Sequence, residues 1–544
     1  MKYLEKWWGW GELDKVYPKD LTSHIHNILK ERFHLSSHHS AIPQEEKIEL
    51  PTSRLSTTDF EDLKNISSSA TEDHKTRLCH SLGKSYIDLI EARKLKRFYA
   101  PDAVVFPTSV EEIVHVLQFC KTRKISLVPF GGGSSVLGGV SPEKKEDHQA
   151  VITLNLQKMK QIFEINPLSN TVHTQTGILG PALEKELNQK GFTLGHFPQS
   201  FEFSSVGGWI ATRSAGQNST FYGKIEDMVV ALKILTPQGL IQTKTVPASS
   251  CGPSFKDFFI GSEGCFGIIV EATLKIHPLP QHKTYQSFLF PDFLQGIRAL
   301  SHIKKLNLSP SLVRLSDAKE TEFLFKMESL KKDFFHLFQK KFFSFLLKKK
   351  KINLGRASLL LIGLEGSHKE IRYLKKQLKM LAKNTLSLGS RPGWKWHKSR
   401  FELPYLRDAL IDQGVMIETF ETATEWHNIE NLYRKVYDTT HTILGPKALV
   451  FCHISHIYLT GASLYFTFLT QAKNDPILQW HQVKERVTKT LLQEGGTLSH
   501  HHGIGRDHKK FLIEEHGPLF VETLKEVKHF LDPQHILNPG KLIE

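Results

Sequence analysis

Hydrophobic and polar positions separate a polar N-terminal part of the chain from a longer part with regular periodicity. Residues 1–95 are rich in His, Ser and Lys, and their apolar positions predict helical patches at Leu21–Phe33 and Ser81–Lys94. The pattern changes at Tyr99–Asp102, after which Ala103–Pro107 predicts a short strand that ends at proline. We therefore interpret residues 1–95 as an N-terminal helical extension.

A helix and a second strand follow. Ser109 and Glu112 have the spacing of a capping box, and the apolar residues after them recur near helical spacing. Ile125–Pro129 predicts a buried strand, and the chain passes from it directly into a glycine loop, Gly131–Ser135. Further strands are expected at Val151–Leu156, Thr171–Thr176, Val229–Thr236 and Gly267–Ile276.

A domain boundary is predicted at Pro278–Pro280, because two prolines one residue apart interrupt any regular element. Residues 281–500 alternate helical and strand patterns, including an alternating strand over His453–Phe468. We therefore expect an α+β fold with a first domain at residues 96–280, a second at 281–500 and a C-terminal segment at 501–544.

Composition and charge narrow the class of protein. The chain has 544 residues, of which 40% are hydrophobic and 23% charged, as in a folded protein with two or three domains. The net charge of +15 favours an acidic partner, which could be nucleic acid, anionic lipid or a phosphorylated substrate. Nucleic acid is disfavoured because the sequence has no helix-turn-helix, zinc-finger or RNP-like pattern, and because the positive charge is spread along the chain.

The five cysteines are scattered and form no CxxC pair, so they indicate neither a zinc ribbon nor a disulfide framework and fit a reducing cytosol. No apolar run has the length of a signal peptide core or of a membrane-spanning helix. We expect a cytoplasmic protein that is at most peripheral to a membrane.

The glycine loop is the first candidate for chemistry. It is not followed by the Gly-Lys-Ser/Thr of a Walker A loop, and it lacks the Gly-x-Gly-x-x-Gly spacing of a dinucleotide fold. Backbone N–H groups without side chains in the way can still form an anion-binding nest for a diphosphate. A flexible tight turn explains three glycines equally well, so the loop alone does not decide.

Four later stretches give the loop a context. Pro198–Ser204, Val206–Gly216, Tyr222–Asp227 and Gly261–Ile269 resemble, in order and spacing, the FAD-binding half of the vanillyl-alcohol-oxidase superfamily. The resemblance implies a PCMH-type FAD-binding domain of two subdomains, followed by an α+β substrate-binding cap. The residues that it places near FAD are Pro129, Phe130, Gly131, Gly132, Gly133, Ser134, Ser135, Pro198, Gln199, Ser200, Phe201, Glu202, Phe203, Ser204, Ala211, Thr212, Arg213, Ser214, Glu263, Gly264, Cys265, Phe266, Gly267, Ile268 and Ile269.

Two departures from the superfamily pattern bear on the cofactor. Members that attach the flavin covalently at the loop have a histidine where this chain has Ser134, so the resemblance implies noncovalent FAD. Cys265 stands where a threonine is usual, a change with little expected effect on binding.

The C-terminal half indicates a narrower resemblance. Flavin-dependent D-2-hydroxyacid dehydrogenases usually have Gly-Glu-His-Gly where this chain has three consecutive histidines, His500–His502. This run resembles the alkyldihydroxyacetonephosphate synthase family, also called alkylglycerone-phosphate synthases. The match includes Lys6–Gly11, Ser311–Leu315, Phe401–Asp408, Glu418–Ala423 and His456–Phe466.

This resemblance implies an exchange reaction in ether-lipid synthesis. The acyl group of acyl-dihydroxyacetonephosphate is replaced by a long-chain fatty alcohol with the help of oxidised flavin, without net redox change. The C-terminal segment would complete the active site.

The resemblance also implies roles for individual residues. Arg407 matches the arginine that holds substrate, with the neighbouring Asp408 able to hold its guanidinium, and Arg314 matches a second important arginine. Tyr458 matches an acid/base tyrosine, and His500, His501 and His502 match the essential histidines, which suits proton transfer next to a ketone.

We expect no metal at the histidine run, because adjacent side chains on regular structure cannot all face one ion. The family uses no metal either.

A lysine-flanked aromatic block, Lys340–Lys351, is a candidate for peripheral contact with an anionic membrane. A partly buried helix with solvated ends explains the same pattern. A homodimer is also compatible with the sequence.

Two other functions remain open at this point. One is an FAD-dependent D-2-hydroxyacid dehydrogenase, and the other is a non-enzymatic lipid-binding protein on the same fold.

Overall fold

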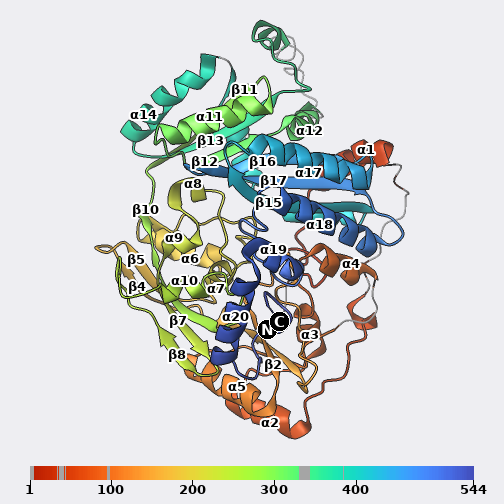
Figure 1. The fold of residues 1–544 in the computed structure, drawn as a ribbon, viewed down its shortest axis with the longest axis vertical. Coiled ribbons are helices and arrows are strands. Elements are labelled where there is room, and N and C mark those ends of the chain that lie inside the picture. Colours follow the sequence, from red (N-terminus) through yellow and green to blue (C-terminus); the bar gives the residue numbers. More distant parts are fainter. Residues whose placement is uncertain are drawn as a thin grey trace.

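The computed structural model describes residues 5–33, 35, 42, 44–94, 99–329, 344–383 and 385–543. Figure 1 shows a lower half, built mainly from the first 280 residues and the last helices, and an upper half dominated by one large sheet. The chain returns to the lower half at its C-terminal end, so the two halves are not consecutive segments of sequence.

The first sheet of the lower half is parallel and three-stranded, with the order β1-β3-β2. Its strands and the helix between the first two are β1 (Ala103–Val105), α5 (Val110–Arg123), β2 (Ser126–Phe130) and β3 (Val151–Asn155). The side chain of Ser109 caps α5 by accepting from the N–H of Glu112 at 3.1 Å. The Glu112 carboxylate accepts instead from the N–H of Thr108, one residue before the expected partner.

The second sheet of the lower half is antiparallel and five-stranded, with the order β4-β5-β9-β7-β8. Its strands are β4 (Ile162–Asn166), β5 (Thr171–Gln175), β7 (Val229–Thr236), β8 (Gly239–Gln242) and β9 (Ile268–Lys275). Helices α6 (Gly180–Gln189), α7 (Val206–Ala211), α8 (Ser219–Tyr222), α9 (Ile225–Met228) and α10 (Phe255–Phe259) lie between these strands in the sequence. A two-stranded pair, β6 (Phe192–Thr193) with β10 (His277–Pro278), leads to the upper half.

The upper half contains a seven-stranded antiparallel sheet with the order β14-β11-β13-β12-β16-β17-β15. Its strands are β11 (His282–Phe290), β12 (Leu312–Ser316), β13 (Ser358–Gly366), β14 (Leu386–Gly389), β15 (Val415–Glu425), β16 (Leu449–Ile457) and β17 (Gly461–Gln471). The helices of this half are α11 (Phe293–Lys305), α12 (Ala318–Ser329), α14 (His368–Leu378), α15 (Arg391–Ser399), α16 (Leu403–Ile411), α17 (Ile429–Leu444) and α18 (Pro476–Gln493). Leu300, Leu432 and Val483 from three of these helices pack with Leu360 and Phe466 of the sheet in one buried cluster.

One strand prediction in this half is wrong. His453–Phe468 is not a single strand but parts of β16 and β17, which form a hairpin that turns between Ile457 and Gly461. The apolar positions change phase between Ile454 and Ile457 and again between Leu459 and Ala462, so a single strand does not fit the pattern. The turn places Tyr458 at the end of a strand, not in the middle of one.

The C-terminal helices α19 (Leu512–His516) and α20 (Pro518–Leu531) pack back on the lower half. Lys528 donates to the carbonyls of Cys265 at 2.6 Å and Leu537 at 2.8 Å, and it pairs with the buried Asp532 at 2.6 Å. Leu537 in turn bridges to Leu127 of β2. The end of the chain is therefore tied to β2 and to the loop before β9, both far earlier in the sequence.

The N-terminal residues form helices α1 (Lys19–Phe33), α2 (Thr57–Ile66), α3 (His74–Cys79) and α4 (Tyr86–Lys94). Before them, Glu5 and Glu12 bridge across a tight reversal, and Trp7 and Trp10 are buried. We call residues 5–12 the N-terminal hairpin. The polar composition of this region hides the fact that its first residues pack inside the molecule.

Within the described parts of the chain, no helix combines the length and the apolar character needed to cross a membrane. Of the lysine-flanked block, Lys340–Phe343 lie outside the described residues. Among the rest, Leu347 packs with Ile352 and Leu359, whereas Phe345 is 59% exposed.

Candidate active site

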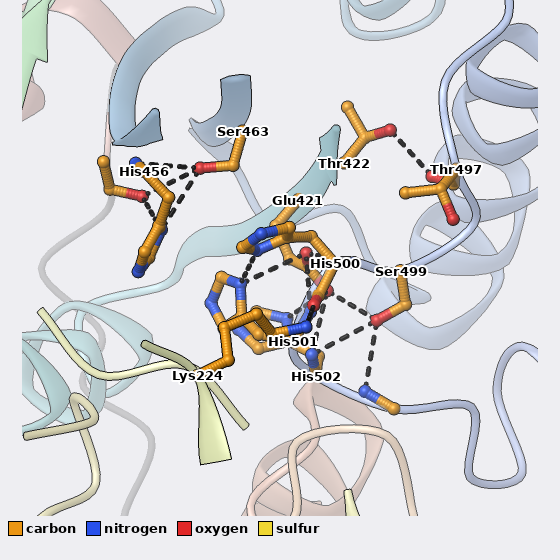
Figure 2. Close-up of polar contacts among 12 residues, drawn as sticks. Lys224, Glu421, Thr422, His456, Ser463, Thr497, Ser499, His500, His501 and His502 are labelled. Atoms are coloured by element: carbon orange, nitrogen blue, oxygen red, sulfur yellow. Dashed lines mark hydrogen bonds and ion pairs between the residues drawn. The ribbon is translucent and has the colours of Figure 1, made fainter. Parts of the chain in front are cut away.

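A single buried carboxylate, Glu421 on β15, organises the histidine run (Figure 2). It accepts from the backbone N–H groups of His500 at 2.6 Å, His501 at 3.1 Å and His502 at 2.9 Å, and from the hydroxyl of Ser499 at 2.6 Å. The run is therefore a tight turn wrapped around one side chain. Although burial alone would raise its pKa, the surrounding histidines hold the pKa of Glu421 well below its usual range.

Two of the three histidine rings are held uncharged by their surroundings. Burial, with the neighbouring His456 and His501 rings, places the pKa of His500 well below its ordinary value. Burial also lowers the pKa of His502 to about 3. His500 and His501 face each other, with their Nδ1 atoms 3.0 Å apart.

Tyr458 meets this cluster from the β16–β17 turn. Its hydroxyl and Nε2 of His500 share a hydrogen bond of 2.6 Å. Burial, with the nearby carboxylates of Glu226, Asp227 and Glu421, raises the pKa of Tyr458 above its ordinary value. At neutral pH the pair is a phenol beside an uncharged imidazole, which can pass a proton in either direction.

His456 ties the cluster to the lower half of the molecule. Its ring lies 5.0 Å from that of His500, and its Nε2 contacts the carbonyl of Gly216 at 2.9 Å while Nδ1 contacts the hydroxyls of Ser455 and Ser463. Burial lowers its pKa to about 3. In the sequence, His456 is only the first residue of the matching segment His456–Phe466. Its distance in sequence from His500–His502 does not indicate that they are in contact.

Arg407 on α16 is oriented by a carboxylate that is not its neighbour in sequence. Its guanidinium pairs with Glu418 of β15 at 3.3 Å and donates to the carbonyl of Lys84 at 3.1 Å. Asp408, the expected partner, instead accepts from the backbone N–H of Trp10 at 2.6 Å. The prediction that Asp408 holds Arg407 is therefore wrong, because successive helical side chains point in different directions.

Arg314 on β12 reaches the histidines only through intermediates. It pairs with Glu320 at 2.6 Å, and Glu320 lies 3.3 Å from Nδ1 of His453. The His453 ring stacks on Tyr465, which stacks in turn on His501. The position of Arg314 therefore suits a role in supporting the wall of the active site better than direct contact with the reacting atoms.

The structure brings together the glycine loop and the three later segments whose residues are expected near FAD. A side chain at Gly132 would overlap the carbonyl of Phe203, and one at Gly264 would meet Pro129. The N–H of Glu263 donates to the carbonyl of Ala211 at 2.9 Å. These contacts join the glycine loop, residues 198–204, residues 211–214 and residues 263–269 into one surface.

Several backbone N–H groups of the glycine loop are available to a ligand. Within the described residues, the backbone N–H groups from Gly132 to Val136 donate to no protein acceptor, and Gly133 has a positive φ of 64°. A run of free N–H groups after a strand suits the diphosphate of a dinucleotide. The residues present therefore fit FAD at this loop.

Several expected FAD residues have structural partners of their own. The Glu263 carboxylate accepts from the N–H of Gly505 at 2.7 Å and so fixes the loop after the histidine run. Cys265 is buried, and burial raises the pKa of its thiol to about 12. Glu202 pairs with Lys15 at 2.7 Å. Their contact with FAD stays a prediction.

The histidine run also contains a group of possible metal ligands. Ligand atoms of Glu421, His500 and His501 all lie within 4.8 Å of one another. Adjacent histidines can face one point here, because the run is a turn and not a regular helix or strand. The prediction of no metal therefore has no geometric support from the histidines.

Comparisons with known proteins define the class. An FAD binding domain model matches residues 101–244, and a model of the C-terminal domain of FAD linked oxidases matches residues 279–542. The chain is an FAD-dependent enzyme of the FAD-linked oxidase type, and the predicted FAD-binding domain with an α+β cap is confirmed.

The relatives narrow the class. Alkyldihydroxyacetonephosphate synthase of Dictyostelium discoideum is 34% identical over 484 residues, covering 87% of this chain and 78% of that protein. The Trypanosoma brucei brucei enzyme of the same name is 34% identical over 477 residues, with the same coverage of 87% and 78%. A solved structure of alkyldihydroxyacetonephosphate synthase matches with a TM-score of 0.83 at 30% identity, covering 98% of this chain and 97% of that one. The chain belongs to the alkyldihydroxyacetonephosphate synthase family.

Proposed function

We propose that this enzyme exchanges the acyl group of acyl-dihydroxyacetonephosphate for a long-chain fatty alcohol and so forms an ether bond. The observation that carries the proposal is the 2.6 Å hydrogen bond between Tyr458 and His500, two groups held uncharged beside the surface that fits FAD. Such a pair can take a proton from the substrate carbon and return it, which an exchange without net redox change requires.

FAD, when bound, would supply an electrophile next to this pair. Glu263 anchors the loop after the histidine run to the FAD-binding half, and Lys224 donates to the carbonyl of His500 at 2.9 Å. Tyr458 would hold the proton at its phenolic oxygen, and Nε2 of His500 would receive it or give it back. Glu421 would keep the three histidines in register without taking part in proton transfer.

Arg407 would bind the phosphate of the substrate. Its side chain is largely buried, its partners are Glu418 and the carbonyl of Lys84, and its Nε–H has no acceptor among the described residues. A phosphate oxygen would satisfy that donor, and guanidinium groups bind phosphate strongly because two N–H groups can donate in parallel. Arg314 would stabilise the wall behind the histidines through Glu320.

The test is incubation of the purified FAD-bound enzyme with acyl-dihydroxyacetonephosphate and a labelled fatty alcohol. Label in an ether-linked product is the expected result. Absence of that product with intact flavin would contradict the proposal, and bleaching of the flavin by a D-2-hydroxyacid under anaerobic conditions would favour the dehydrogenase.

We also propose that the enzyme is cytoplasmic and touches anionic membranes through the block Lys340–Lys351. An apolar segment between lysine runs can combine buried area with charge attraction, and Phe345 is exposed in the described part. Replacing Lys348, Lys349, Lys350 and Lys351 with glutamate should abolish sedimentation with anionic liposomes. Unchanged sedimentation would contradict this contact.

A homodimer is a separate proposal, and light scattering would test it.

A further inference from the structure

A cavity lies where the two halves meet. It has a volume of about 480 Å³, within the range of about 300–1,000 Å³ typical of small-molecule sites. Its lining includes Glu184 of α6, Tyr222 of α8, Lys283 of β11, Glu365 of β13 and Arg400. None of Arg407, Tyr458 or the three histidines lines it.

Both carboxylates of this cavity are already satisfied by the protein. Glu184 accepts from the hydroxyl of Thr193 at 2.8 Å and from the N–H of Leu194 at 2.9 Å, and burial raises its pKa. Glu365 accepts from the hydroxyl of Tyr222 at 2.7 Å and is paired with Lys283. Both carboxylates also act on Arg400 through space, but neither forms a hydrogen bond or an ion pair with it.

Arg400 has no such partner. Its guanidinium lies over the ring of Phe197 at 4.9 Å and over that of Phe401 at 4.7 Å. One of its nitrogens donates to Nδ1 of His397 at 2.9 Å. In the part of the chain that the structure describes, no carboxylate lies within 4.0 Å of this guanidinium.

The acceptor that Arg400 does have carries no charge. Burial, with the positive charges of Arg400 and Lys283, lowers the pKa of His397 to about 4, so its ring is neutral at physiological pH. Burial lowers the pKa of Arg400, and with only a neutral acceptor and two aromatic faces in contact its guanidinium keeps part of its donor capacity. Counting the exposed Lys185, three basic side chains face two acidic ones around the cavity.

Apart from the polar Asn188 and Thr193, the remaining walls are apolar. Phe197, Phe201 and Leu279 line the cavity with Pro181 and Pro280. A ligand that fits these walls and also satisfies Arg400 has an anionic head on an apolar body.

We propose that this cavity is a second ligand site, which binds a carboxylate attached to an apolar chain with its head on Arg400. The natural ligand is then the fatty acid that leaves the substrate, an identification that rests on the proposed function. The existence of the site rests on the cavity and on Arg400 alone.

The test is binding of dodecanoate to the FAD-bound enzyme, measured by calorimetry and compared with 1-dodecanol, which has the same chain without the charge. Dodecanoate should bind at least about tenfold more tightly than the alcohol, as one charge-assisted hydrogen bond provides. Arg400→Gln should remove that difference and leave alcohol binding unchanged, and Arg400→Lys should keep part of it.

Two matched controls locate the site. Arg407→Gln, in the other site, and Lys185→Gln, at the exposed rim, should leave dodecanoate binding unchanged. Flavin absorbance and the melting temperature show whether each variant is folded, and Arg400→Lys gives the result if Arg400→Gln is not. Equal dodecanoate binding by wild type and Arg400→Gln would overturn the proposal, as would loss of binding in Arg407→Gln alone.

The binding measurement needs no turnover. If exchange activity is absent but dodecanoate binding depends on Arg400, the proposed function fails and the site stands. If exchange occurs but binding does not depend on Arg400, the site fails and the function stands.

Discussion

At the scale of single residues, the active site depends on groups whose charge is set by burial. Tyr458 and His500 are kept neutral, whereas Glu421 is kept ionised by three N–H groups, a hydroxyl and nearby histidines. A proton that passes between this neutral pair and the substrate leaves a charge on the pair, and the fixed carboxylate of Glu421 offsets the positive charge of a protonated His500.

Tyr458→Phe removes one hydroxyl and keeps the ring. Because the phenol would carry the proton, we expect the rate of alkyl exchange to fall by about 10²–10⁴-fold, with FAD still bound. The measurement is steady-state exchange with labelled alcohol. The matched control is Tyr433→Phe, which removes another partly buried hydroxyl, 3.0 Å from Asp317, and should lower stability but not the rate. Activity of Tyr458→Phe within about threefold of wild type would contradict the role.

Glu421→Gln should loosen the histidine turn. A neutral amide accepts fewer N–H groups than the carboxylate, and we expect a loss of about 3 kcal/mol in the free energy of unfolding at pH 7, measured with denaturant. Since folding lowers the pKa of Glu421, its contribution is present above its ordinary value of 4.5 and is lost as the pH falls below it. The difference between wild type and variant should therefore shrink in acid. A difference that stays constant from pH 7 down to about pH 2, below the lowered pKa, would contradict this assignment.

At the scale of elements, the N-terminal hairpin fixes the helix that carries Arg407. Trp10 donates its N–H to Asp408, and a side chain at Gly9 would overlap the same carboxylate. Gly11 has a φ of 80° and packs on the ring of Tyr405. The hairpin thus contacts α16 at two residues that flank Arg407 along the helix.

Gly11→Ala tests this contact. The new methyl group would overlap the Tyr405 ring on a strained backbone, so we expect a loss of about 2–3 kcal/mol in stability and a raised KM for the phosphorylated substrate. Gly191→Ala is the matched control, because Gly191 has a similar φ of 79° with nothing within 4 Å of the added carbon. It should cost about 1 kcal/mol and leave KM unchanged. Equal effects of the two variants would show that the hairpin does not position α16.

At the scale of the whole molecule, the C-terminal tail closes the lower half around the FAD surface. Lys528 joins the carbonyl of Cys265, within an FAD stretch, to the buried Asp532. Asn538 donates to the carbonyl of Glu263 at 2.7 Å. The last residues of the chain therefore support the cofactor surface although none of them was expected to contact FAD.

Lys528→Ala leaves Asp532 buried without its cation. We expect a loss of about 3–5 kcal/mol in the free energy of unfolding, and weaker FAD binding because the loop that contains Cys265 loses its anchor. Denaturant unfolding and flavin fluorescence measure the two effects. Lys525→Ala, which removes an exposed partner of Glu522, should change neither. FAD affinity equal to wild type in Lys528→Ala would contradict the coupling.

Much of this molecule could be predicted from local patterns. Strand periodicity located β2 and β7 to within one residue, and Ser109 marked the start of α5. The glycine loop and the histidine run were visible because rare local spacings carry them. These features depend on residues that are close in the sequence, because the period of apolar positions and the backbone freedom of glycine act over a few residues.

The tertiary structure alone decided which carboxylate serves which cation. Asp408 adjoins Arg407 in sequence, yet Glu418 pairs with the arginine and Asp408 holds the N-terminal hairpin. Glu421 of β15 binds the backbone of the histidine run, and Arg400 forms no ion pair with a carboxylate of the described residues. Such pairings depend on strand order and helix docking, which bring together groups tens to hundreds of residues apart. A local sequence pattern covers only neighbouring residues, so it cannot predict these pairings.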